Sequence, residues 1–312
     1  MKKSYILIAA VFMVAVMAGC LFWYWSATGE IKDPVKEPMF TAETYPRVDA
    51  SLAIHPLVDA IAADFLVVDE STLTYEYTTG RSAEVYRNLI DGKVDVIFAA
   101  EISDEDRAYA AQQGVELKII PATASAFVFI VNSENPVDGL TLEQIQDIYT
   151  GDITDWSQVG GANAPIIPYQ RPTGSGSQTA MLKLVMKDKT IMEPPTKQLR
   201  MEMGELVDAI ADYDNADTAI GYSYFYYVNT MYKRDTVKML AVDGVMPSVD
   251  TIKSGEYPIF TNGFIVLRAD EPADSPASKW VEAVLSKRGS RIIEDAGYVP
   301  VKIGRASCRE RV

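Results

Sequence analysis

Cysteine and histidine are nearly missing from this chain of 312 residues. There are two cysteines, Cys20 and Cys308, close to opposite ends, and one histidine, His55. The sequence therefore offers neither a disulfide framework nor a cysteine metal site. A lone histidine also removes most zinc and histidine-based catalytic chemistry, and we expect His55 to be a residue at the start of a helix rather than a ligand. We expect no metal and no other cofactor.

Runs of basic residues are also missing. The chain has 29 Lys and Arg against 43 Asp and Glu, a formal net charge of -14. Nucleic acid and an anionic bilayer surface are thus poor partners for the body of the protein. Surface charges beyond a Debye length of roughly 8 Å are screened, so a site for an anion would have to act locally, through aimed amides, hydroxyls and guanidinium groups.

The N-terminal segment has the pattern of a lipoprotein signal peptide. Lys2 and Lys3 precede an apolar stretch that ends in small residues and Cys20. We expect residues 1–19 to be removed and Cys20 to carry a lipid, which would hold the protein on the extracytoplasmic face of the cell membrane. The alternative is an uncleaved anchor helix, because residues 21–25 extend the apolar run to about the 20 residues that a bilayer span needs.

Two further terminal segments are not expected to belong to the fold. Residues 20–42 carry glycine and proline among charges, which predicts a linker from the tether to the body. Residues 303–312 are basic and unpatterned, and they resemble a translated sequencing adapter. We interpret them as a non-native tail, in which Cys308 has no role.

Strand-like apolar runs alternate with helical patterns between the two ends of the body, which predicts parallel sheets with crossover helices. The predicted helices cover residues 56–65, 84–90, 142–149, 175–186, 201–213 and 277–296. The predicted strands cover residues 94–99, 126–132, 165–169, 219–222, 238–242 and 263–268.

Several strings in this order and spacing resemble the phosphate-binding proteins of ABC transporters. They are Phe129-Ile130-Val131-Asn132 with Asn135-Pro136, Ile148-Tyr149-Thr150-Gly151, Gln170-Arg171-Pro172-Thr173-Gly174-Ser175-Gly176-Ser177, and Ile220-Gly221-Tyr222. The resemblance covers about residues 43–302, nearly the whole body, and is more specific than any one short motif.

The resemblance implies an α/β fold, the two-lobed clamp of type II periplasmic-binding proteins. Each lobe would be a mixed sheet flanked by helices, and two crossing strands would join the lobes around a ligand cleft. Lobe 1 would comprise residues 43–126 plus 258–302, and lobe 2 residues 127–257. Residues 126–131 and 257–264 resemble the crossing segments.

A glycine-rich turn that opens a predicted helix supplies half of the expected site. A helix N-terminus offers unpaired N–H groups and about half a positive charge to an oxyanion. Small residues let the anion approach, and the planar fork of Arg171 matches two of its oxygens. From the family pattern we carry over Arg171, Ser175, Gly176 and Ser177. The alternative is a surface turn with a capping serine and a solvated arginine.

The other half of the site would come from lobe 1. By position in the family, Ser51 would offer a hydroxyl and Leu52 a backbone amide, and Thr79 and Ser82 are candidates for a further hydroxyl. Glu101 sits where the family has an acid that accepts the proton of a protonated phosphate and repels sulfate. The alternatives are helix capping for Ser51, Thr79 and Ser82, and a solvated surface position for Glu101.

Four tyrosines follow one another closely after the strand predicted at residues 219–222. Tyr222, Tyr224, Tyr226 and Tyr227 could line the cleft, but we expect them to pack in the core or on the lobe surface.

The function implied by the resemblance is capture of inorganic phosphate outside the membrane for an ABC-type importer, without catalysis. The partners would be the anion, the permease membrane subunits and, through the lipid anchor, the membrane; we expect a monomer. The alternatives are another oxyanion (sulfate, molybdate or an organic phosphate) or a sensory role. A phosphoester-processing enzyme is disfavoured, because no base accompanies a nucleophilic serine and no Walker A string is present.

Overall fold

The computed structural model describes residues 37–73, 80–212 and 217–301 of the chain. Residues 1–39 and 40–312 separate into two units, and the account below concerns the second. The signal peptide, Cys20 and the C-terminal tail predicted from the sequence lie outside the described residues. Phe40, near the end of the predicted linker, is already part of the body, where its ring stacks on Phe65. Within the described ranges, no helix combines the length and the apolar character that a membrane span requires.

The described residues alternate between helices and strands in the following order. The first half contains β1 (Val48–Ala50), the 3-10 turn η1 (Leu52–Ile54), α2 (His55–Leu66), η2 (Glu70–Thr72), α3 (Ser82–Ile90), β2 (Val96–Ala99), α4 (Asp104–Gln112), β3 (Leu117–Asn132), β4 (Gly139–Leu140), α5 (Leu142–Thr150) and η3 (Trp156–Val159). The second half contains β5 (Ile167–Pro168), α6 (Gly176–Ala180), which continues as the π-helical segment η4 (Met181–Met186), η5 (Thr196–Gln198), α7 (Met203–Ala211), β6 (Ala219–Tyr224), the π-helical η7 (Tyr227–Met231), β7 (Val237–Met239), β8 (Ala241–Val242), α8 (Val249–Ser254), β9 (Phe260–Arg268), α9 (Pro276–Val284), α10 (Lys287–Asp295) and β10 (Val299–Pro300).

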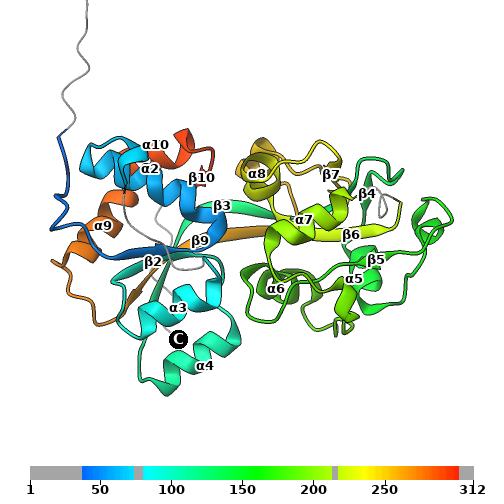
Figure 1. Cartoon of the computed structure of the whole chain (residues 1–312), viewed down its shortest axis with the longest axis horizontal. Helices are drawn as coiled ribbons and strands as arrows, with labels where there is room; N and C mark the ends of the chain where they lie inside the picture. Colours follow the sequence, from blue (N-terminus) through cyan, green and yellow to red (C-terminus); the bar gives the residue numbers. More distant parts are fainter. Residues whose placement is uncertain (1–36, 74–79, 213–216, 302–312) are drawn as a thin grey trace, which may run out of the picture. The chain divides into compact units, whose positions relative to one another are not determined.

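A long strand, β3, links the two ends of the main sheet, whose strand order is β1-β2-β9-β3-β6-β5 (Figure 1). The N-terminal part of β3 pairs with β9 from Leu117 to Ala126, and its C-terminal part pairs with β6 from Phe127 to Val131. Both ladders are antiparallel, whereas β1 with β2 and β5 with β6 are parallel. The sheet is therefore mixed, and β3 is the strand that joins its two ladders.

Helices cover both faces of the β1-β2-β9 end of the sheet, and the alternation of side chains in β2 decides which helices pack where. Val96 and Phe98 share a core with α2, α9 and α10, whereas Ile97 and Ala99 share another with α3. Figure 1 shows the two groups of helices on opposite sides of these strands. A strand that is apolar on every position, as β2 is, requires cover of this kind.

The other end of the sheet has its own core. Residues Ala126–Val131 of β3 pack there with β6 and with the buried sides of α5, α6 and α7. Trp156 and Tyr149 are among the largest fully buried side chains of this core. Strand β3 therefore runs from one core to the other. Side chains of β3 between the two cores face a cavity rather than a core.

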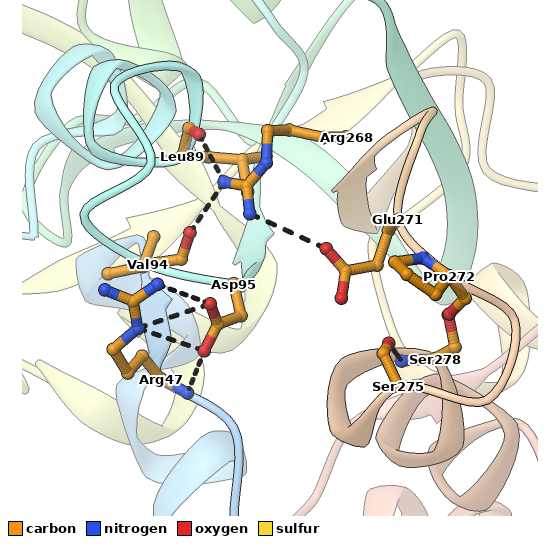
Figure 2. A network of polar contacts seen from close by, with 9 residues as sticks. All are labelled: Arg47, Leu89, Val94, Asp95, Arg268, Glu271, Pro272, Ser275 and Ser278. Carbon is orange, nitrogen blue, oxygen red and sulfur yellow. Dashed lines mark hydrogen bonds and ion pairs between the residues drawn. The ribbon is translucent and has the colours of Figure 1, made fainter.

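An ionic network ties the edge strand to its neighbours (Figure 2). The Arg47 guanidinium donates to both carboxylate oxygens of Asp95, with 2.6 Å from Nη2 to Oδ1. Arg268 donates to the carbonyl oxygens of Leu89 and Val94, 2.9 Å each. These contacts fix the loop between α3 and β2 against β9, which holds the start of β2 in register.

The fold class predicted from the sequence is confirmed as a mixed α/β fold with helix-flanked sheets, and every predicted helix and strand is present in part or in full. The prediction of parallel sheets was wrong for the central ladders, since β9 and β6 both run antiparallel to β3. Helices α4 and α8 were not predicted. The lobe boundaries stay predictions, because residues 40–312 form a single compact unit.

Candidate anion-binding site

The turn before α6 brings this helix close to α3. Gly174 has a φ of +84°, a conformation that glycine adopts without strain. The Ser175 hydroxyl caps the helix by accepting a hydrogen bond from the Gln178 amide, 3.2 Å away. At Gly176, a Cβ atom would lie 2.6 Å from Ser82 Oγ. Glycine is therefore required here because the start of α6 rests directly on the start of α3.

Arg171 lies at the head of this turn and is only 6% exposed. Its backbone N–H donates to the Tyr222 hydroxyl at 2.9 Å, which fixes the backbone position. Its Nε and Nη1 atoms are buried and have no hydrogen-bond partner among the described residues. Burial lowers the pKa of Arg171 from its ordinary value. A buried guanidinium with unpaired donors is costly unless an anion joins it, so the position is suited to an anionic ligand.

Two hydroxyls complete a set of donors without partners. Ser177 Oγ and Tyr224 Oη are buried, and neither finds a hydrogen-bond partner in the described part of the chain. Burial raises the pKa of Tyr224, so its hydroxyl keeps the proton and can donate it. Both residues line the same cavity as Arg171. Three side chains, from the turn before α6, from α6 and from β6, thus present unused donors to one space.

The facing wall of the cavity comes from η1 and α3. Ser51 directly follows β1 and begins the turn η1, and its hydroxyl lies 3.1 Å from the hydroxyl of Ser82. Both line the cavity, so the structure brings Ser51 and Ser82 together with the α6 turn. The Leu52 amide, however, already donates to the Gly80 carbonyl at 2.9 Å. Because this amide already has an acceptor, the structure does not agree with its predicted contact with an anion.

The cavity that these walls enclose has a volume of about 320 Å³. Its lining includes the predicted residues Ser51, Leu52, Ser82, Arg171, Ser175, Gly176 and Ser177. Thr79 lies outside the described residues, so its role stays a prediction.

Glu101 does not line the cavity. Its carboxylate pairs with Arg107 at 3.4 Å and lies 3.8 Å from Lys183 Nζ. The acid expected at the site therefore forms ion pairs outside the cavity, and Glu101 is not part of the proposed site. Among the described residues, the carboxylates that line the cavity are Glu84 and Glu202.

Sequence reasoning placed the tyrosines after residue 219 in the core or on a surface. Tyr222 is fully buried, whereas Tyr224, Tyr226 and Tyr227 line the cavity. The alternation of side chains along β6 could have predicted Tyr224. It puts Tyr222 and Tyr224 on the same face of the sheet, and Tyr224 is the last residue of the strand. The pattern alone does not reveal where the core stops.

Polar contacts also join the segments on the two sides of the cavity. Arg81, next to Ser82, donates through Nε to Glu202 at 3.0 Å. Lys183, on the helix that continues α6, donates to the Ile102 carbonyl at 2.9 Å and pairs with Asp104 at 3.1 Å. Together with the contact at Gly176, these contacts enclose the unpaired donors.

The described residues contain no group of histidine, cysteine and carboxylate side chains that could hold a metal. His55 begins α2, where Nε2 lies 2.8 Å from the Ala50 carbonyl. Burial lowers the pKa of His55, so it stays neutral as a packing residue. A cavity lined by donors, with no described metal cluster, is suited to binding an anion.

Residues 42–286 match the family model of the PBP superfamily domain, and the chain belongs to this family. The chain is 25% identical over 260 residues to the phosphate-binding protein PstS of Bacillus subtilis, covering 81% of this chain and 80% of the relative. It is 24% identical to PstS of Borreliella burgdorferi, covering 82% of this chain and 89% of the relative.

A solved structure with bound phosphate also resembles the chain. It is a candidate phosphate ABC transporter substrate-binding protein from Clostridium perfringens, 26% identical, with a TM-score of 0.66 and coverage of 82% of this chain and 98% of that one. A phosphate transport receptor from Vibrio cholerae, 20% identical with a TM-score of 0.61, shows the same fold.

Proposed function

We propose that this chain binds phosphate outside the cytoplasmic membrane and delivers it to an ABC-type importer. The observation that carries the proposal is the set of buried donors without partners, Arg171, Ser177 and Tyr224, in one cavity. The relatives named as phosphate-binding proteins, and the similar structure that holds phosphate, support the choice of anion.

The proposed ligand contacts are the Arg171 guanidinium, the amides at the start of α6, and the hydroxyls of Ser51, Ser82, Ser175, Ser177 and Tyr224. An anion there gains charge-assisted hydrogen bonds and the favourable end of the helix dipole. Thr79 stays a candidate. Closing the two walls on the anion would produce the form that a permease recognises.

Lipid attachment at Cys20 is part of the proposal and rests on the signal pattern of residues 1–20. It would hold the binding domain on the extracytoplasmic face of the cell membrane, and we propose that the protein is a monomer. In cells, Cys20→Ser should release the protein from the membrane fraction. Retention of this variant on membranes would favour the alternative of an uncleaved anchor helix.

Calorimetry with phosphate and with sulfate tests the function. We expect phosphate to bind and sulfate to bind more weakly, and no phosphate ester to be hydrolysed on long incubation. Absence of heat with phosphate would remove the proposal, and turnover of an ester would replace it with an enzyme.

A further inference from the structure

A buried chain of polar side chains lies behind the turn that carries the anion donors. It consists of Gln170, Gln178 and Tyr222, all buried, and none of the three is among the residues that line the cavity. Gln170 directly precedes Arg171 at the head of the turn, and Gln178 lies in α6 at its end. The chain therefore joins both ends of the turn behind the anion-facing surface.

The directions of the hydrogen bonds in this chain are fixed. Gln170 Nε2 donates to the Met192 carbonyl at 2.9 Å, which leaves Gln170 Oε1 to accept from Gln178 Nε2 at 3.3 Å. Gln178 Oε1 then accepts from the Arg171 backbone N–H at 3.3 Å, a group that can only donate. The Tyr222 hydroxyl accepts from the same N–H at 2.9 Å and donates to Gln178 Oε1. Every polar side chain of the network thus has partners of the right kind.

The Tyr222 ring is itself held by the core. Its centroid lies 5.4 Å from that of Phe127 and 5.8 Å from that of Tyr149. Burial raises the pKa of Tyr222, so the hydroxyl keeps the proton that Gln178 accepts. The position of the hydroxyl, and with it that of the Arg171 backbone, is therefore set by the packing of β3 and β6.

The side chain of Arg171 has much less support than its backbone. Its Nε and Nη1 atoms are buried and have no hydrogen-bond partner in the described part of the chain. The direction of the guanidinium before an anion binds therefore depends on how the backbone is held. A buried network whose members are all satisfied is rigid, and donors that are already in position lose less freedom on binding.

We propose that Tyr222 and Gln178 are positioning residues for anion binding. They touch no ligand, and they hold the Arg171 backbone so that the guanidinium points into the cavity before the anion arrives. The Gln178 backbone N–H also donates to Ser175 Oγ at 3.2 Å, so one residue links Arg171 to the start of α6. This inference rests on the proposed function, because Arg171 and the start of α6 are the proposed phosphate contacts.

A double-mutant cycle, read by titrating the full-length chain with inorganic phosphate, tests the positioning role of Tyr222. Tyr222→Phe removes the hydroxyl and keeps the ring. It should weaken phosphate binding about three- to tenfold, the range of one neutral hydrogen bond. In the Arg171→Met background the same change should alter phosphate affinity by no more than about twofold, because the group that the hydroxyl positions is gone. A loosened core would instead weaken binding in both backgrounds.

Tyr149→Phe is the matched control. Tyr149 is a fully buried tyrosine of the same core that does not line the cavity, and its hydroxyl donates to the Tyr169 carbonyl at 3.4 Å. Its phosphate affinity should stay within about twofold of the wild type. If Tyr222→Phe binds like the wild type, or loses equally in both backgrounds, the positioning role is overturned and the proposed function is untouched. A wild type that binds no phosphate overturns both.

Gln178→Met gives a second reading that does not depend on Tyr222→Phe folding well. It keeps the length of the side chain and removes the oxygen that accepts from both Arg171 and Tyr222. We expect phosphate binding to weaken at least as much as in Tyr222→Phe, and to change by no more than about twofold when Arg171→Met is already present. A loss of the same size in both backgrounds would show that Gln178 does not act through Arg171.

Discussion

Replacing Arg171 should separate binding from stability. Its guanidinium has two buried donor atoms, Nε and Nη1, that have no partner within the described chain. A hydrogen bond to a charged group contributes about 1.5–3 kcal/mol, so losing two costs about 3–6 kcal/mol of binding free energy. At 1.4 kcal/mol for each factor of ten, Arg171→Met should weaken phosphate binding at least about 100-fold.

The ligand-free protein should respond in the opposite direction. Arg171 is buried and forms no ion pair with a described residue, and its lowered pKa reflects the cost of that burial. Methionine keeps much of the aliphatic packing and removes the charge. We therefore expect the free energy of unfolding of ligand-free Arg171→Met to be equal to or above that of the wild type, measured by urea denaturation at pH 7.

Arg200→Met is the matched control. It removes the same charge from a guanidinium that lies over the Tyr169 ring, 4.5 Å from its centroid, and that does not line the cavity. Phosphate affinity should stay within twofold in the control. The reasoning is refuted if Arg171→Met binds phosphate within threefold of the wild type, or if it loses more than about 2 kcal/mol of ligand-free stability, as a structural arginine would.

Two more predictions concern close packing and pH. Gly176→Ala places a Cβ atom 2.6 Å from a facing hydroxyl, and overpacking of this kind costs about 1–3 kcal/mol. Urea denaturation should show the ligand-free protein destabilised by about this amount, and calorimetry should show weaker phosphate binding; wild-type stability would contradict the close approach. For Asp95, partial burial raises the pKa, but the hydrogen bonds and charge of Arg47 outweigh it, so the pKa lies below its usual value. The carboxylate therefore stabilises the fold fully above the unfolded pKa of about 3.9, and this contribution disappears as the pH falls through the lower folded value. Urea denaturation between pH 7 and pH 3 should show a smaller acid loss for Asp95→Asn than for the wild type, and parallel curves would argue against the pairing.

The glycine-rich turn shows what could be predicted from local sequence. Small residues before an amphipathic pattern predicted a helix start near Ser175, and the structure has Ser175 as the cap of α6. Arg171 was placed near that turn by spacing alone. Its burial and its missing partner could not be predicted, because both depend on how far the facing wall with Ser82 closes.

Glu101 and Tyr224 show where prediction from sequence stopped. The position of Glu101 after strand β2 was recognised, but its ion pair with Arg107 depends on α4, which was not predicted. Tyr224 continues the alternation of β6 beyond the core, and its hydroxyl lies in the cavity only because β6 pairs with β3 near the passage between the two cores. Such register is a property of the assembled sheet.

The sequence by itself determined the mixed α/β class, most of its helices and strands, the anion-suited turn before α6 and the family. These depend on short-range patterns of apolar spacing, glycine and capping residues. Only the tertiary structure decided which donors are left without partners, which carboxylates are already paired, and which residues line the cavity. Those properties arise from contacts between residues far apart in the chain, such as Arg81 with Glu202 and Ser51 with Ser82, which no local pattern encodes.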